Sequence, residues 1–326
     1  MKSWHIGNFN EVNLKEGTLV PREGEVKLKV SKVALSSTDM SCFANREDKH
    51  SVTVPAHAAV AYVTGDDDAR GFKLGSRVVV NPYVKAVEHG ETVIKTMGVD
   101  TDGLLQDFVC VPAENVCPLP DGISDEEAVF AECIAMGNKV FSELSCDRGD
   151  YIVIVGAGTL GLILCQLAMY YQTIPILIDL DNEKLELARM WDICYALNPT
   201  YDNLERRVEE ITGGRMSEAA VFTTEGVGLN SVLHLVKNGS EVVIAGYSTS
   251  EKHYVGSDFI LRKQLRVKGV CNGYGEMPSA INLLANKIVK TNGIITSREV
   301  FDDVPKIFEE CVKYPYQLNT VLVDVD

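Results

Sequence analysis

The sequence predicts an α/β protein in which a β-rich N-terminal part precedes a doubly wound parallel sheet. Up to about residue 125, β-branched runs and alternating patterns, such as residues 25–30, 77–80 and 108–111, lie between turns rich in Gly, Pro and Asp. From about residue 126, strand patterns alternate with helix patterns instead. Such alternation favours parallel strands that are joined by crossover helices.

The second part opens with a helix signal. Ser124 and Glu127 have the spacing of a capping box, which predicts a helix that reaches residue 144. The periodicity predicts strands over residues 151–155, 174–178, 219–223, 241–245 and 265–270, and a short one near residue 195. It predicts helices over residues 159–171, 182–190, 203–211 and 229–236.

Little chain remains after residue 271. A helix pattern over residues 280–290 and a strand pattern over residues 321–325 are too short for a third domain. The chain end is therefore expected to return to the first part, which gives one domain of residues 1–125 with 272–326 and another of residues 126–271. The strand over residues 265–270 would have an exposed edge able to pair with a symmetry mate, which predicts a homodimer or a dimer of dimers.

Composition narrows the classes of partner. The formal net charge is −15 over 326 residues, whereas nucleic acids and anionic membranes require concentrated Lys and Arg. We therefore expect a small-molecule substrate, and neither nucleic acid nor membrane as a partner. No signal-peptide pattern or bilayer-spanning run is present, and nine scattered cysteines fit a reducing compartment, so a cytoplasmic location is predicted. Asp66 to Asp68 is interpreted as a solvated turn.

A glycine motif follows the first strand pattern of the second part. Gly156, Gly158 and Gly161 have the spacing G-x-G-x-x-G between an apolar strand pattern and a helix pattern. The first glycine permits a tight turn, the second lets the backbone approach a pyrophosphate, and the third lets helix pack on strand. Thr159 and Leu160 complete the turn, where free N–H groups and the helix dipole favour phosphate. This context predicts a Rossmann dinucleotide-binding domain.

The strand pattern over residues 174–178 ends in Asp179. A carboxylate at this position can accept hydrogen bonds from the adenosine ribose hydroxyls and would repel the 2′-phosphate of NADP. Lys184, in the next helix, is close enough in sequence to close over the ribose. NAD is therefore the predicted cofactor.

With these features, the chain resembles the medium-chain dehydrogenase/reductase family, most closely its zinc-containing polyol branch of sorbitol, threonine and sugar-acid dehydrogenases. Residues 71–79 (GFKLGSRVV), 98–103 (GVDTDG) and 111–121 (VPAENVCPLPD) are similar to family segments, and Asp179 and Lys184 have the family's spacing. The resemblance covers nearly the whole chain. It implies an oxidoreductase with a GroES-like catalytic domain beside the Rossmann domain.

The resemblance also implies where a catalytic zinc would be held, and the ligands are incomplete. Ser36 stands where the family has the Cys of a C-G-[ST]-D segment, and Ala58 replaces the Glu of G-H-E. His57 and Glu132 remain, and they would be the metal ligands only if zinc is bound. Catalytic zinc normally has three protein ligands, so zinc binding is expected to be weak unless a neighbour such as Asp39, Cys42 or Cys133 substitutes. The four-cysteine structural zinc site is expected to be absent, since residues 84–97 contain no Cys.

Without zinc, alcohol oxidation needs a general base and hydrogen-bond donors in the metal's place. The catalytic candidates are His57, Thr38 and Glu132, with Ser36 at the former ligand position. Lys139 follows Glu132 by two helical turns and is a further candidate, although an ordinary surface lysine is the alternative interpretation. His57 also has a purely structural interpretation.

Three functions follow from these residues. The first is an NAD-dependent dehydrogenase or reductase acting on a polyol, sugar or related alcohol/carbonyl pair, with weak or no zinc dependence. The second is a metal-free reductase of activated double bonds such as enones, for which no tyrosine or other proton donor can be placed from the sequence. The third is a non-catalytic sensor of NAD(H), which the two altered ligand positions keep open.

Overall fold

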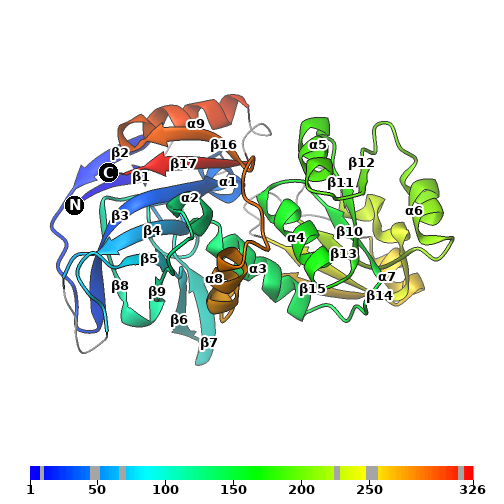
Figure 1. The fold of residues 1–326 in the computed structure, drawn as a ribbon, viewed down its shortest axis with the longest axis horizontal. Coiled ribbons are helices and arrows are strands. Elements are labelled where there is room, and N and C mark those ends of the chain that lie inside the picture. Colours follow the sequence, from blue (N-terminus) through cyan, green and yellow to red (C-terminus); the bar gives the residue numbers. More distant parts are fainter. Residues whose placement is uncertain are drawn as a thin grey trace.

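The computed structural model describes residues 1–7, 11–44, 52–65, 71–223, 228–246, 256–314 and 319–325. Two sheets lie side by side, with helices between them, and both chain termini lie on the half that contains the N-terminal sheet (Figure 1). The predicted turn over Asp66 to Asp68 lies outside the described residues.

The N-terminal half is built on a seven-stranded sheet. Its strand order is β16-β17-β3-β4-β5-β9, and β8 pairs with β3. The bounds are β3 Glu25–Ser36, β4 Ala58–Val63, β5 Arg77–Val80, β8 Phe108–Pro112, β9 Val116–Pro118, β16 Ile295–Val300 and β17 Thr320–Asp324. Two antiparallel pairs flank this sheet, β1 Lys2–Ile6 with β2 Val12–Glu16 and β6 Tyr83–Glu88 with β7 Glu91–Thr96.

The second sheet is parallel and has six strands in the order β12-β11-β10-β13-β14-β15. Its strands are β10 Tyr151–Val155, β11 Ile174–Ile178, β12 Tyr195–Leu197, β13 Ser217–Phe222, β14 Val236–Ala245 and β15 Arg266–Val270. Counted along the chain, this is the order 3-2-1-4-5-6 of a Rossmann sheet, in which ligands bind where the order reverses, beyond the carboxyl ends of the strands. That point lies between β10 and β13.

Helices cover both sheets. Their bounds are α1 Ser37–Ala44, α2 Asp125–Ala128, α3 Ala131–Ser142, α4 Thr159–Tyr170, α5 Asn182–Met190, α6 Leu204–Thr212, α7 Ser257–Lys263, α8 Met277–Ala285 and α9 Val304–Lys313. The capping box at Ser124 and Glu127 is formed as predicted. The predicted single helix is nevertheless broken into α2 and α3 at residues 129–130.

Helix α3 lies at the junction of the two halves, where it packs against α4 and α8 (Figure 1). One apolar cluster continues through this junction, from Ala34 and Val60 of the first sheet through Ile134 of α3 to Ile152 and Val243 of the second. Separate clusters fill the other face of each sheet. Because a core extends across the junction, α3 holds residues near both sheets in a fixed relation.

The end of the chain joins the N-terminal sheet, as expected from its length. Strand β17 lies between β3, to which it is antiparallel, and β16, to which it is parallel. Strand β16 and helix α9 were not predicted. The helix expected over residues 229–236 is wrong: two 3₁₀ turns, Leu229–Ser231 and Leu233–Leu235, lead into β14 instead. The predicted domain boundaries remain a prediction.

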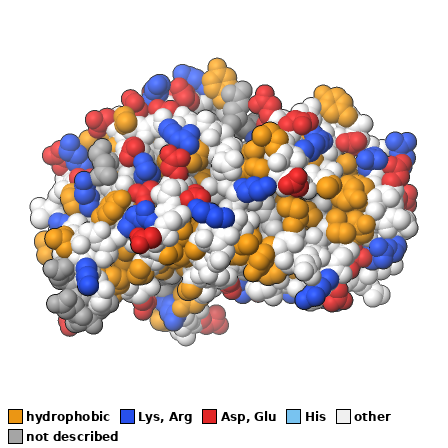
Figure 2. All heavy atoms as spheres, viewed as in Figure 1, with side chains coloured by type: hydrophobic (Ala, Val, Ile, Leu, Met, Phe, Trp, Pro, Cys, Tyr) orange, Lys and Arg blue, Asp and Glu red, His pale blue; other side chains and the backbone are white. Residues whose placement is uncertain are grey.

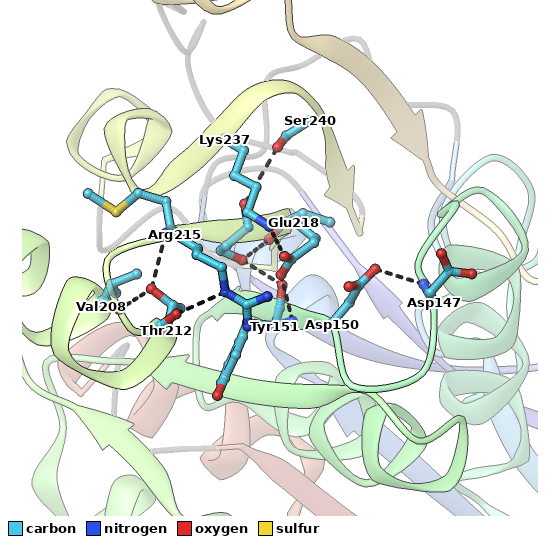
Figure 3. A network of polar contacts seen from close by, with 12 residues as sticks. Asp147, Asp150, Tyr151, Val208, Thr212, Arg215, Glu218, Lys237 and Ser240 are labelled. Carbon is cyan, nitrogen blue, oxygen red and sulfur yellow. Dashed lines mark hydrogen bonds and ion pairs between the residues drawn. The ribbon is translucent and has the colours of Figure 1, made fainter.

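A polar network joins the first residues of strands in the second sheet, at the end opposite to the glycine turn (Figure 3). Glu218 of β13 pairs with Lys237 of β14 and accepts the N–H of Tyr151, the first residue of β10. Nearby, Arg215 donates to the carbonyl of Thr212. These residues lie at the amino-terminal ends of the parallel strands, whereas ligands bind beyond the carboxyl ends. We therefore interpret the network as structural.

Positive and negative side chains are interspersed over the face in Figure 2 rather than gathered into one basic patch. Within the described ranges, no helix has the length and apolarity that crossing a bilayer requires.

Candidate active site and dinucleotide site

The glycine turn lies directly after β10, at the point where the strand order reverses. Gly156 has a positive φ of 103°, which favours glycine. A Cβ on Gly161 would lie 1.7 Å from the Gly156 carbonyl oxygen, so helix α4 crosses the turn too closely for any side chain there. A Cβ on Gly158 would instead meet nothing within 4 Å. Protein packing therefore leaves the backbone at Gly158 open to a ligand, and the turn fits a dinucleotide pyrophosphate.

Asp179 is held beside this turn. Its carboxylate accepts the Ala157 N–H at 2.6 Å and the Asp181 N–H at 2.8 Å. Asp181 caps α5 through the N–H groups of Glu183 and Lys184, which places Lys184 in the first turn of that helix. Each oxygen of Asp179 accepts one backbone hydrogen bond and keeps a lone pair for a further donor, as a ribose hydroxyl would need.

A hydroxyl contact joins the glycine turn to the first sheet. Thr159, the first residue of α4, lies with its Oγ1 2.8 Å from the Oγ1 of Thr320. Thr320 begins β17, and its register partner in β3 is Ser36. The dinucleotide turn and the Ser36 segment are thus neighbours, although they come from different sheets. Leu160, the next residue of the turn, is half-buried.

Asp39 organises the segment that contains the predicted residues Ser36 and Thr38. Its Oδ2 accepts the N–H of Ser36 at 2.8 Å and the Ser36 hydroxyl at 2.9 Å, and Ser36 Oγ in turn accepts the Thr38 N–H at 3.2 Å. Its Oδ1 accepts the buried N–H of Ala56 at 2.8 Å. A buried carboxylate with three such donors is well compensated, so this pattern fixes the loop before His57.

The backbone at Ala56 is strained. Its φ is +76°, in the left-handed region that costs a non-glycine residue about 1 kcal/mol. Gly98 and Gly103 are the first and last residues of the GVDTDG segment, and both pack against the carbonyl of Ala56. A Cβ would lie 2.4 Å from that oxygen if added to Gly98, and 2.2 Å from it if added to Gly103. Leu104 donates its N–H to the same oxygen. The two glycines therefore let the chain clamp Ala56 and orient the next residue, His57.

His57 lies between two carboxylates. Its Nδ1 is 3.8 Å from Asp39 Oδ1, and its Nε2 is 3.7 Å from Glu132 Oε2. Glu132 lies in the first turn of α3, where the helix dipole favours negative charge. The other Glu132 oxygen accepts a hydrogen bond of 2.6 Å from the hydroxyl of Tyr83. All four side chains are buried. The structure thus brings together His57 and Glu132, the two ligand positions that the family resemblance implied, and it adds Asp39 and Tyr83.

The donor set does not fit a zinc site with three protein ligands. Ser36 Oγ already donates to Asp39, and Ala58 supplies no donor. Over the ranges that the structure describes, no three His, Cys, Asp or Glu side chains are grouped so that they could hold a metal. Burial, with the nearby Glu132 carboxylate, raises the pKa of the Cys133 thiol well above its usual value, which disfavours the thiolate that zinc requires.

Lys139 is not part of this cluster. Its ammonium pairs with Glu143 at 2.9 Å, toward the end of α3, as the surface interpretation predicted. Tyr83 and Thr320 were missed by the sequence, because neither belongs to a motif and each reaches its partner only through the fold.

Two family models match the chain. The model described as alcohol dehydrogenase GroES-like domain matches residues 22–121, and the one described as zinc-binding dehydrogenase matches residues 159–286.

Relatives match over most of their length. An uncharacterized zinc-type alcohol dehydrogenase-like protein of Haemophilus influenzae is 27% identical over 308 aligned positions, and the alignment covers 90% of this chain and 89% of that protein. The L-threonine 3-dehydrogenase of Photorhabdus laumondii is 28% identical over 314 aligned positions, and the alignment covers 87% of this chain and 88% of that enzyme.

Solved structures share the fold. A short chain alcohol dehydrogenase (rspB) of E. coli CFT073 complexed with NADH has a TM-score of 0.86 at 23% identity, over 100% of this chain and 99% of that one. Galactitol-1-phosphate dehydrogenase of Escherichia coli has a TM-score of 0.85 at 21% identity, over the whole of both chains.

Proposed function

Because the chain belongs to the medium-chain dehydrogenase/reductase family, we propose that it is an NAD-dependent oxidoreductase with weak or no dependence on zinc. Its substrate is a polyol, sugar or related alcohol/carbonyl compound. Two relatives named above support an activity on CH–OH or C=O groups: the zinc-type alcohol dehydrogenase-like protein of H. influenzae and the L-threonine 3-dehydrogenase of P. laumondii, each matched over most of its length.

One observation carries this proposal: the dinucleotide turn is joined to the segment beside His57. Thr159 of the turn contacts Thr320, and Thr320 pairs in register with Ser36, which shares Asp39 with the loop before His57. A cofactor bound on the turn can therefore extend toward the buried polar cluster. Hydride transfer needs this proximity of cofactor and substrate.

The cluster supplies acid–base chemistry. NAD, if bound on the glycine turn, would supply the acceptor for the hydride of the carbinol carbon. The hydroxyl proton of the substrate passes to His57, and the positive charge that develops on the imidazole lies between the Asp39 and Glu132 carboxylates, 3.8 and 3.7 Å away. The Thr38 hydroxyl is the candidate donor to the developing carbonyl, because the Ser36 hydroxyl already donates to Asp39. In the reverse direction His57 returns the proton.

Turnover assays test the activity. The near-UV absorbance of NADH is followed with polyols, sugars, L-threonine and vicinal diols in one panel, and with enones in another. Alcohol oxidation supports the proposal. Enone reduction alone would favour the metal-free double-bond reductase, and tight NADH binding without any turnover would favour the sensor. A His57→Ala variant with full activity would remove His57 from the mechanism.

Metal analysis tests the zinc statement. We expect substoichiometric zinc in protein purified without chelator, because His57 and Glu132 are the only two of the family's ligand positions that keep a metal-binding side chain. The matched variant Ser36→Cys with Ala58→Glu restores the two family donors and is expected to gain zinc. Stoichiometric zinc in the unaltered protein would contradict the proposal.

The assembly and the compartment are also proposed. Strand β15 ends the six-stranded sheet, and its edge supports a homodimer or dimer of dimers formed by strand pairing. Sedimentation equilibrium would measure this. All nine cysteines are free thiols, which supports the cytoplasm as the location.

A further inference from the structure

Tyr83, a residue of the N-terminal half, places a buried phenol in the candidate active site. Tyr83 is only 2% exposed, and its hydroxyl donates to Glu132 Oε1 at 2.6 Å. The partner is also buried, and a short hydrogen bond to a carboxylate in such surroundings is among the stronger kinds found in proteins. Tyr83 begins β6, the first strand of the hairpin that occupies the region where the family resemblance implied a cysteine-rich lobe.

The backbone of Tyr83 is held on both sides. Its N–H donates to Asn81 Oδ1 at 3.2 Å, and its carbonyl accepts Asn115 Nδ2 at 2.9 Å. Asn115 also donates to the Asn81 carbonyl at 2.7 Å and accepts the Asn81 N–H at 2.8 Å through its own carbonyl. Two hydrogen bonds thus hold the backbone of Tyr83 and two more hold Asn81 in place beside it, so the Tyr83 side chain has little freedom to move away from its acceptor.

The two carboxylate oxygens of Glu132 have different neighbours. Oε1 is engaged by Tyr83, and Oε2 faces His57 Nε2 at 3.7 Å. Rotation of the carboxylate would break the short hydrogen bond, so Tyr83 opposes it. We propose that Tyr83 is a positioning residue, which holds Glu132 in the orientation that stabilises the proton transferred to His57.

The proposal rests on the proposed function, because it assigns Tyr83 a part in the same reaction. Tyr83 need not touch the substrate; it acts through Glu132. Its effect should therefore appear in kcat more than in the affinity for NADH, since the dinucleotide turn lies on the other sheet.

A double-mutant cycle separates positioning from mere structure. The four proteins are the unaltered enzyme, Tyr83→Phe, Glu132→Gln and the double variant. We expect Tyr83→Phe to lower kcat by about 10-fold while the Kd for NADH, from fluorescence titration, changes less than two-fold. In the Glu132→Gln background, Tyr83→Phe should lower kcat no further, because its route of action is already lost. Effects on kcat that multiply in the double variant would overturn the proposal.

Tyr62→Phe is the matched control. Tyr62 also donates to a carboxylate, Asp125 Oδ2 at 3.2 Å, in the same half of the molecule but outside the His57 cluster. This variant should keep kcat within two-fold. If Tyr83→Phe does not fold, Glu132→Asp replaces it: the charge remains, the carboxylate withdraws by one methylene, and kcat should fall with NADH binding intact.

The outcomes are distinct. Unaltered kcat in Tyr83→Phe or in Glu132→Asp, in an enzyme that oxidises alcohols, overturns the positioning role and leaves the proposed function intact. Absence of turnover by the unaltered protein overturns the proposed function and the positioning role with it.

Discussion

Replacing Asp179 by asparagine removes a negative charge from the dinucleotide site and keeps the size of the side chain. Asp179 is half-buried and accepts the N–H groups of Ala157 and Asp181. Asparagine can accept only one of these with its oxygen, since its amide group is a donor. The substitution therefore changes the charge that a bound ribose or 2′-phosphate would meet and loosens one contact of the turn.

The charge accounts for most of the expected effect. Two unit charges about 5 Å apart interact by about 3 kcal/mol at an effective dielectric constant of about 20. A 2′-phosphate carries nearly two charges, and the partial exposure of Asp179 screens about half of the total interaction, which leaves about 3 kcal/mol. This corresponds to about a 100-fold gain in kcat/KM for NADP. For NAD, weaker hydrogen bonds to the ribose should cost about 10-fold.

The assay compares kcat/KM for NAD and NADP with one substrate, and NADH and NADPH affinities by fluorescence. Asp181→Asn is the matched control: it removes a nearby charge, but asparagine still caps α5, so the cofactor preference should change far less. An NAD/NADP ratio that Asp179→Asn leaves within three-fold of the original would refute the assignment of Asp179 to the ribose.

Three further predictions concern the backbone and pH. Gly161→Ala should abolish NADH binding in a fluorescence titration, because its Cβ would lie 1.7 Å from the Gly156 carbonyl oxygen; retained binding would contradict the turn geometry. Ala56→Gly should raise the free energy of unfolding in urea by about 1 kcal/mol, since φ is +76°; a loss would show that no strain is relieved. Burial raises the pKa of Glu241, but the Ser145 N–H and two neighbouring cations outweigh it, so that pKa is lowered below 4.5. A depressed pKa stabilises the fold above the unfolded-state value. Glu241→Gln should therefore cost about 1–2 kcal/mol at pH 7, and the difference should shrink as the pH falls below about 4.5; a constant difference would refute the linkage.

The dinucleotide site could be predicted because its determinants are local. Gly156 and Gly161 are close in sequence, and the conformation that needs them depends on the strand and helix directly beside them. Asp179 follows from the next strand of the same unit. The pairing of His57 with Glu132 came only through the family resemblance, because nothing in their spacing indicates that they meet.

The remaining contacts depend on tertiary structure. Tyr83 reaches Glu132 across 49 residues, and Thr159 reaches Thr320 across 161; neither distance leaves a periodic signal. At residues 229–236, in contrast, the sequence predicts a helix that the structure does not contain. Its apolar spacing favours a helix, but Asn230 accepts the N–H of Gly256 and the β-branched residues lead into β14, so only 3₁₀ turns form.

Strand β17 follows every other strand of its sheet in the sequence, yet it occupies an interior place between β16 and β3. Lys32 and Asp324, paired across β3 and β17, are 292 residues apart. The parallel sheet can assemble during synthesis, whereas residues 32–36 of β3 lack their partner strand until residues 320–324 have been synthesised. Contacts of such long separation close slowly. Deletion of residues 320–324 should therefore expose the edge of β3 and favour aggregation of the nascent chain over folding.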